Sequence, residues 1–259
     1  QITMLTSTLG FDQVRRRAGL PKRKLYSPFK DSPPRLRAPI LCAWSPSLIP
    51  PSSDWHPRVH VTGYYFFPYN DSYTPPNELS RFLESGIPPV CVSFGSMVNK
   101  NAEEIDAIIR ESLKRKRTNN RGIILSGWGS MHHESTGDLL YLESAPHDWL
   151  LPKCKMIIHH GGAGTTSAAL RAGIPQVVVP FMADQPFWGS RVHAIGAAPK
   201  PIRVNQLSVE KMVSAIAEAE SKIILERAQF TGQEIRGEDG VMNAVRLIEL
   251  YAISFNESA

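Results

Sequence analysis

Cysteine is scarce in this chain, and the few cysteines show no metal-binding or disulfide pattern. They are Cys42, Cys91 and Cys154, an odd number spread widely along the sequence. Zinc sites use closely spaced cysteine or histidine pairs, and secreted disulfide frameworks use even sets. We therefore expect a reducing, cytoplasmic setting with neither a zinc site nor a disulfide framework.

The chain also lacks a long apolar run and the signals of a nucleic-acid-binding module. No stretch approaches the roughly 20 apolar residues that span a bilayer, and Gln1 begins neither a signal peptide nor a transit sequence. The net charge is +5, with basic clusters at residues 15–17, 22–24 and 114–117, but no RNA- or DNA-binding motif accompanies them. We expect no nucleic-acid partner, and any contact with a membrane surface would be peripheral.

What the chain has is the composition of a globular protein, with 42% hydrophobic and 20% charged residues. Its two regions differ in texture. Prolines at 28, 33, 34, 39, 46, 50, 51 and 57 break residues 1–85 into short pieces. We interpret residues 1–85 as the C-terminal remnant of one domain plus a linker, and residues 86–259 as a second domain.

The second region alternates apolar strands with helices. Strands are predicted at residues 89–94, 122–125, 139–142, 156–159 and 176–179, and an amphipathic helix begins after Asn101, with Glu104 as its capping-box partner. Two further helical stretches, around residues 207–216 and 241–248, look like covering helices. Such alternation is typical of an α/β fold with a Rossmann-like parallel sheet, which binds ligands beyond the carboxyl ends of its strands.

A glycine-rich segment at residues 159–166, His-His-Gly-Gly-Ala-Gly-Thr-Thr, joins the strand 156–159 to a helix that ends at Gly173. Glycines let a phosphate approach the unpaired N–H groups at a helix N-terminus. The segment lacks the Gly-Lys-Ser/Thr of a P-loop, and no paired acidic metal site is evident. We expect amides, histidine and the helix dipole to neutralise the phosphate charge, with neither a metal nor another cofactor.

Five motifs together resemble the sterol 3-beta-glucosyltransferase group of the GT-B, family 1 glycosyltransferases. They are Ser-Phe-Gly-Ser-Met at 93–97, Ser-Gly-Trp-Gly at 126–129, Ala-Pro-His-Asp-Trp-Leu at 145–150, the segment at 159–166, and Pro-Phe-Met-Ala-Asp-Gln-Pro-Phe-Trp-Gly at 180–189. Their order and spacing match the C-terminal, donor-binding half of that family. Residues 59–64 also resemble its interdomain junction, so the resemblance covers nearly the whole chain.

The resemblance implies that UDP-glucose is the donor and the 3-hydroxyl of a sterol is the acceptor. It places His160 and residues 162–166 on the diphosphate, Asp184 and Gln185 on the sugar hydroxyls, and Ala145, His147 and Trp128 near the uracil. Ser93, Gly95 and Ser96 would line the opposite lip. The implied donor-binding residues are Ser93, Gly95, Ser96, Trp128, Ala145, His147, His160, Gly162, Ala163, Gly164, Thr165, Thr166, Asp184 and Gln185.

Each of these residues also has a structural alternative. Trp128 and Trp149 fit core positions, the pair His147-Asp148 fits a helix cap, and Asp184 fits the cap of a turn. One departure concerns Ala168, which stands where the plant secondary-metabolite enzymes of the wider family carry a glutamate for the nucleotide ribose. The choice of uridine therefore rests on the resemblance alone.

The family's general base, a histidine oriented by an aspartate, belongs to the N-terminal domain, which we expect upstream of Gln1. The resemblance implies an inverting transfer for the whole enzyme, with this chain inactive by itself and no catalytic residue within it. Two alternatives stay open at this point. One is a nucleotide-sugar-binding subunit that docks to a separate acceptor-domain chain, and the other is an epimerase or hydrolase of nucleotide sugars.

Overall fold

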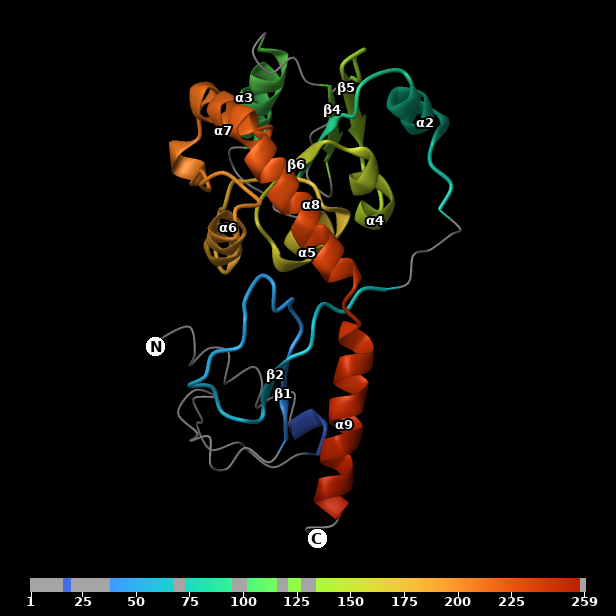
Figure 1. Cartoon of the computed structure of the whole chain (residues 1–259). Coiled ribbons are helices and arrows are strands. Elements are labelled where there is room, and N and C mark those ends of the chain that lie inside the picture. Colours follow the sequence, from blue (N-terminus) through green and yellow to red (C-terminus); the bar gives the residue numbers. More distant parts are fainter. Residues whose placement is uncertain are drawn as a thin grey trace.

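The computed structural model describes residues 16–19, 38–67, 73–94, 102–115, 121–126 and 134–256. It shows a five-stranded sheet covered by helices, and a smaller region built from two strands and one long helix (Figure 1). The sheet holds the five strands predicted for the second domain.

The larger sheet is parallel throughout and has the strand order β5-β4-β3-β6-β7. Its strands are β3 (Val90–Ser93), β4 (Gly122–Leu125), β5 (Leu139–Leu142), β6 (Met156–His159) and β7 (Gln176–Val178). Every residue of β3, β4, β6 and β7 is buried. Continuous apolar strands of this kind belong to a parallel sheet that is covered on both faces, and the α/β prediction is confirmed.

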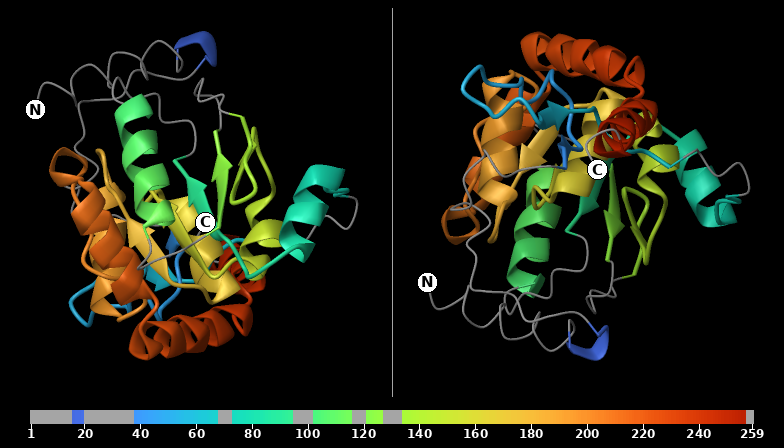
Figure 2. Two further views of the ribbon diagram at one scale, coloured as in Figure 1. Left: turned by 90° about the horizontal axis from the view of Figure 1, so that it is seen from above. Right: turned by 90° about the horizontal axis from the view of Figure 1, so that it is seen from below.

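Alternate residues of each strand feed two separate cores, because successive side chains point to opposite faces. Val90 and Val92 pack in a core with α3 (Ala102–Lys114) and α7 (Val209–Ala219). Cys91, between them, packs with α2 (Asn77–Glu84), α4 (His147–Leu150), the 3-10 turn η2 (Leu151–Lys153) and α5 (Ala163–Ala172). Figure 2 shows these helices around the sheet from two further sides.

Three more helical elements follow the sheet. They are α6 (Gln185–Ala194), the 3-10 turn η3 (Val204–Gln206) and α8 (Lys222–Arg236), while α7 begins at the cap residue Ser208, whose hydroxyl accepts from the Lys211 N–H at 3.3 Å. Helix α5 ends at Gly173, which adopts the left-handed φ of 73°. This is the usual C-cap glycine conformation, and it agrees with the predicted stop.

The smaller region consists of β1 (Ile40–Cys42), β2 (Val59–Val61) and α9 (Gly240–Asn256). Strands β1 and β2 are parallel, and the Tyr251 hydroxyl of α9 lies 2.9 Å from the His60 Nε2 of β2. Leu48 and Tyr64 join this region to the helices around the sheet through a third core, which contains residues of α5, α6 and α8.

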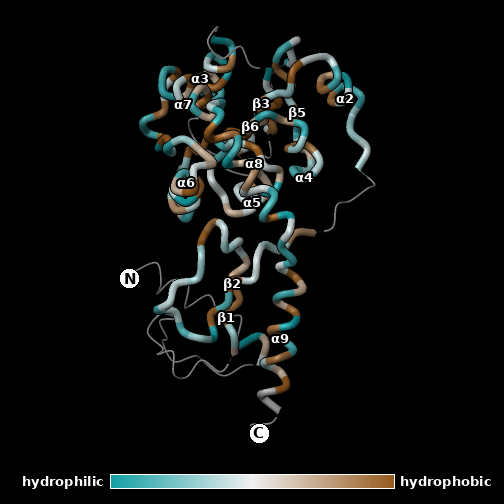
Figure 3. The backbone as a smooth tube through the Cα atoms, viewed as in Figure 1, coloured by the Kyte–Doolittle hydropathy of each residue, from teal (hydrophilic) through white to brown (hydrophobic). Residues whose placement is uncertain are grey.

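Helix α9 corrects one expectation, since it was predicted to cover the sheet. It lies beside β1 and β2 instead, below the sheet in Figure 1. The chain reaches it by crossing the backbone at Gly63, so close that a Cβ on Gly240 would lie 2.4 Å from the Tyr64 carbonyl oxygen. Apolar residues on α9 remain exposed, among them Ile248, Leu250 and Ile253. Figure 3 shows hydrophilic and hydrophobic stretches alternating along this helix.

The domain boundary between residues 85 and 86 stays a prediction. Helix α2 precedes that boundary but packs on the sheet, because Leu79 and Phe82 are buried in the core there. Helix α9 follows the boundary and contacts β2. Contacts across the fold therefore do not follow a single cut in the sequence.

Candidate functional site

The strand order of the sheet reverses between β3 and β6, and we place the candidate site there. The chain leaves β3 toward β4 on one side and leaves β6 toward β7 on the other. Ser93 and His159 are paired neighbours at the carboxyl ends of these two strands. A crevice opens at such a switch point because the following helices diverge, and open α/β sheets bind their ligands there.

The turn after β6 requires glycine. Gly161 has a φ of +86°, and an added Cβ would lie 2.7 Å from Val178 Cγ1 and 2.9 Å from the backbone oxygen of Gln185. Space at Gly162 is limited by a side chain, since an added Cβ would lie 2.4 Å from His160 Nε2. These two glycines let the chain turn sharply from β6 into α5.

The N-terminus of α5 presents its backbone amides to the outside. Gly162 is the N-cap residue and no side chain caps the helix, so the first N–H groups have no partner within the helix. Ala163 and Gly164 are exposed, and a Cβ on Gly164 would meet no atom within 4 Å. The protein's own packing therefore does not require glycine at 164, whereas a closely approaching ligand would.

Two threonines follow these amides. Thr165 is half-buried. Thr166 is fully buried, and its Oγ1 has no hydrogen-bond partner within the described residues. A buried hydroxyl without a protein partner is uncommon, and here it stands in the first turn of a helix suited to an anion.

His160 lies directly before this turn, and its side chain is partly buried. Burial lowers its pKa, and this outweighs the opposing effects of a hydrogen bond with the Ser93 backbone and of the charge on Asp184. Its Nδ1 is buried without a partner among the described residues. In a neutral histidine, a ring nitrogen without a protein partner can donate or accept a hydrogen bond, according to its tautomer, with a ligand at the helix N-terminus.

His147 approaches from the opposite side of the crevice. It is the first residue of α4, and its Nε2 lies 3.3 Å from the hydroxyl of the buried Ser93. Burial lowers the pKa of His147, with Asp148 raising it and His160 lowering it further. Ala145, two residues earlier, is half-buried. The structure thus brings Ser93, His147 and His160 to one edge of the sheet.

His159, although adjacent to His160, has a structural role. The Gly161 N–H donates to its Nδ1 at 3.1 Å, so the ring proton is on Nε2, which donates to Gln176 Oε1 at 2.9 Å. The side chain is fully buried, and burial lowers its pKa to about 3. Both ring nitrogens are used inside the protein, where they hold the glycine turn against β7.

Asp184 and Gln185, predicted for the sugar hydroxyls, point in different directions. Asp184 is exposed and occupies the N-cap position of α6 without capping it, since its Oδ2 accepts from the Trp188 indole N–H at 2.7 Å. Gln185 is buried, and its Oε1 accepts from the N–H groups of Phe181 and Met182 at 2.8 and 3.1 Å. Its carboxamide oxygen therefore holds the loop before α6.

The remaining predicted residues divide between described and undescribed parts of the chain. Gly95, Ser96 and Trp128 lie outside the residues that the structure describes. Trp149 is half-buried, lies 5.2 Å from the ring of Tyr73 and carries the Lys153 ammonium 3.9 Å from its own ring centre. Trp149 is thus the core aromatic that its structural alternative proposed.

The chain resembles known proteins in sequence and in fold. The profile of the erythromycin biosynthesis protein CIII-like C-terminal domain matches residues 137–238. A sterol 3-beta-glucosyltransferase of Arabidopsis thaliana is 43% identical over 205 residues, 78% of this chain and 32% of the relative. The O-mycaminosyltylonolide 6-deoxyallosyltransferase of Streptomyces fradiae is 35% identical over 246 residues, 93% of this chain and 56% of the relative.

The fold comparison agrees with the sequence comparisons. The calicheamicin glycosyltransferase CalG4 superimposes with a TM-score of 0.69 at 19% identity, over 93% of this chain and 59% of that structure. The structure therefore has the GT-B glycosyltransferase fold, and the sequence resembles these relatives over most of its length. It spans about a third of the plant sterol glucosyltransferase and somewhat more than half of the bacterial relative.

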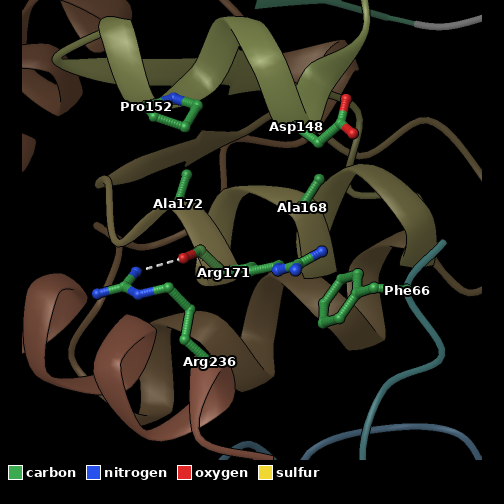
Figure 4. A pocket seen from close by; sticks show the side chains of 7 residues that line it. All are labelled: Phe66, Asp148, Pro152, Ala168, Arg171, Ala172 and Arg236. Atoms are coloured by element: carbon green, nitrogen blue, oxygen red, sulfur yellow. Dashed lines mark hydrogen bonds between the residues drawn. The ribbon is translucent and has the colours of Figure 1, made fainter. Parts of the chain in front are cut away.

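A cavity of about 440 Å³ in this GT-B chain lies beside the predicted site without including it. It is lined by Phe66, Asp148, Pro152, Ala168, Arg171, Ala172 and Arg236. Figure 4 shows Asp148 and Pro152 across from α5, and the Arg236 guanidinium bonded to the Arg171 carbonyl at 2.5 Å. His147 therefore faces the crevice, while its neighbour Asp148 faces this cavity.

Sequence reasoning gave no role of their own to two side chains near the candidate site. Trp188 stands four residues after Asp184, and the i, i+4 spacing on a helix was the available signal. Asp148 was weighed only as part of a helix cap, yet α4 is capped by Pro146 without a side-chain bond. Within the described residues there is no helix long and apolar enough to cross a membrane, and no group of three or more potential metal ligands.

Proposed function

We propose that this chain is the donor-binding half of a glycosyltransferase that moves glucose from UDP-glucose to the 3-hydroxyl of a sterol with inversion. One observation carries the proposal: the uncapped N-terminus of α5 opens at the switch point of the sheet, directly after His160. Backbone N–H groups and the helix dipole make that position suited to a diphosphate.

The diphosphate would lie against the amides of Ala163 and Gly164, within reach of the Thr165 hydroxyl. Gly164 has open space where a Cβ would stand, which allows a phosphate oxygen to come close to the backbone. His160 would add one hydrogen bond through its ring. In this arrangement amides, hydroxyl and dipole stabilise the leaving group as negative charge develops on it, and no metal ion is needed.

The nucleoside would extend along α5, away from the diphosphate. Ala168 is one turn beyond Thr165 on the same helix face and lines the cavity of about 440 Å³. Asp148 lines the same cavity, and its carboxylate is suited to accept hydrogen bonds from ribose hydroxyls. We propose that Asp148 performs, from α4, the task that a glutamate at position 168 performs in the plant secondary-metabolite enzymes.

The sugar would lie near Asp184, on the opposite side of the diphosphate from the cavity. The negative charge of Asp184 acts on His160, whose pKa it raises, so the two side chains are electrostatically coupled. An exposed carboxylate can accept two hydroxyl hydrogen bonds, and a site built on such bonds rejects a sugar that lacks the hydroxyl. Gln185 contributes by holding the loop that carries Asp184.

The acceptor and the stereochemistry rest on the relatives. The Arabidopsis thaliana relative is named for glucosylation of the sterol 3-hydroxyl, and the Streptomyces fradiae relative for transfer of a deoxysugar to a macrolide. We favour the sterol because the identity is higher there. The general base that deprotonates the acceptor would come from the N-terminal domain of the complete enzyme.

Calorimetric titration with UDP, UDP-glucose and dTDP-glucose tests the donor site on this chain. Gly164→Ala should leave the fold intact, because its Cβ meets no protein atom, yet weaken UDP binding about tenfold by blocking the phosphate, a loss of about 1.4 kcal/mol. The matched control is Gly137→Ala, whose Cβ also meets nothing within 4 Å but which lies in an exposed turn before β5.

Two results would contradict the proposal. A folded chain that binds none of the three nucleotides lacks the donor site. Equal UDP affinities for Gly164→Ala and wild type would show that the diphosphate does not bind at the N-terminus of α5. The acceptor is tested separately by a glucosylation assay with a sterol and a macrolide, using the chain together with its upstream domain. Transfer to the macrolide alone would overturn the sterol assignment.

A further inference from the structure

Asp184 has a partner that neither the motifs nor the relatives assign. Trp188 lies one turn further along α6, and its indole Nε1–H donates to Asp184 Oδ2 at 2.7 Å. A hydrogen bond to a carboxylate is charge-assisted, and it is shorter and stronger than a bond between neutral groups. One oxygen of Asp184 is therefore tied to the helix that follows it, which sets the direction of the other oxygen.

The backbone of Asp184 is fixed independently of this bond. Ala183 adopts a positive φ of 55°, a conformation that costs free energy for a residue with a Cβ and persists only where the surroundings impose it. The carboxamide of Gln185 binds the N–H groups of Phe181 and Met182 in the same loop. With the backbone set by this turn, the remaining freedom of Asp184 is the rotation of its side chain, which Trp188 restricts.

Trp188 is itself held by the smaller region of the molecule. Its ring meets the ring of Trp44 edge to face, with centroids 6.5 Å apart. Trp44 precedes β2 in the connection from β1, and its indole N–H donates to the Ile49 carbonyl at 3.2 Å. Arg191, one turn beyond Trp188 on α6, donates to the Leu48 carbonyl at 2.8 Å. The 44–49 loop thus contacts α6 at two residues, Trp188 and Arg191.

We infer that Trp188 is a positioning residue that orients the Asp184 carboxylate toward the hydroxyls of the donor sugar. This inference rests on the proposed donor site. Trp44 holds Trp188 in the rotamer that makes the bond. Recognition of the sugar, but not of the nucleotide diphosphate, thereby depends on how the 44–49 loop is seated against α6. A loop from one region of the molecule sets the sugar specificity of a site built by the other.

Trp188→Phe tests this inference, because phenylalanine keeps an aromatic ring against Trp44 and removes the N–H donor. UDP, which has no sugar, should bind the variant with wild-type affinity. UDP-glucose should lose about tenfold in affinity, and Asp184→Ala should add no further loss in the double variant, since both changes remove the same interaction. The matched control is Trp55→Phe, another ring in contact with Trp44, at 6.4 Å, which should change neither affinity.

The outcomes separate the inference from the proposed function. No UDP binding by the wild-type chain overturns the proposed function and the inference with it. Wild-type UDP-glucose affinity in Trp188→Phe overturns the inference alone, as does an equal loss for UDP and UDP-glucose. If Trp188→Phe does not fold, the indole proton resonance of Trp188 gives a second test: Asp184→Asn should shift it upfield, and an unchanged resonance would contradict the hydrogen bond.

Discussion

The sheet region and the smaller region of this molecule are held together in different ways. The sheet has two apolar cores, one on each face, and its central strands are completely buried. The smaller region shares one core with α5, α6 and α8, while the apolar residues of α9 stay largely exposed. The sheet region is therefore stabilised by its own two cores. The positions of β1, β2 and α9 depend on a few contacts at their junction with the sheet region.

Truncating one isoleucine in each region tests this difference in stability most directly. Ile157 of β6 is fully buried in the core on one face of the sheet, and Ile248 on α9 is 53% exposed. Ile157→Ala should lower the free energy of unfolding by about 2–5 kcal/mol, because the change leaves a cavity. Ile248→Ala should stay within about 0.5 kcal/mol. Urea unfolding measures both, and equal losses would show that the face of α9 is covered in solution.

The junction between the regions is probed by Gly240→Ala. The new Cβ would lie 2.4 Å from the Tyr64 oxygen and 2.6 Å from the Gly63 carbonyl carbon, so one of the two crossing backbones must move. We expect a loss of about 1–3 kcal/mol, typical of overpacking, and faster amide exchange in α9 than in β6. Hydrogen exchange measures this difference. Uniform acceleration across the sheet would mean that the two regions unfold as one unit.

The third prediction concerns the pH dependence of the sheet region. The pKa of His159 is about 3 in the folded chain against 6.5 ordinarily, because burial disfavours the imidazolium. Below pH 6.5 the unfolded chain binds a proton that the folded chain does not, so stability falls by up to about 1.4 kcal/mol per pH unit. Between pH 6.5 and 5 the loss is about 1.6 kcal/mol.

Chemical denaturation at several pH values measures this loss. His159→Gln removes the titrating group, so the variant should lose less stability than wild type between pH 6.5 and 5, by up to about 1.6 kcal/mol. The same pH dependence in both proteins would assign it to other groups, such as His147 or His160, whose pKa values are also lowered by burial. Amide exchange in α9 should change less with pH than exchange in β6.

These regions also differ in how well the sequence predicted them. Strands β4, β5 and β6 lie at the predicted residues, because short apolar runs between turn residues can bury themselves only in a covered sheet. The stretch around residues 241–248 was correctly predicted as a helix but wrongly placed on the sheet. Its periodicity specifies a helix, whereas the surface against which it lies depends on the crossing of Gly240 over Gly63.

Local periodicity and glycine at defined positions are enough to predict the parallel sheet, the glycine turn after β6 and the helix that follows it. Three contacts became visible only in the folded chain: Gln185 binds its own loop, His159 is bonded inside the protein, and Trp188 donates to Asp184. Trp44 and Trp188 are far apart in the sequence, and their contact follows from how the 44–49 loop packs on α6. Such contacts arise from the packing of the whole chain, which no local pattern encodes.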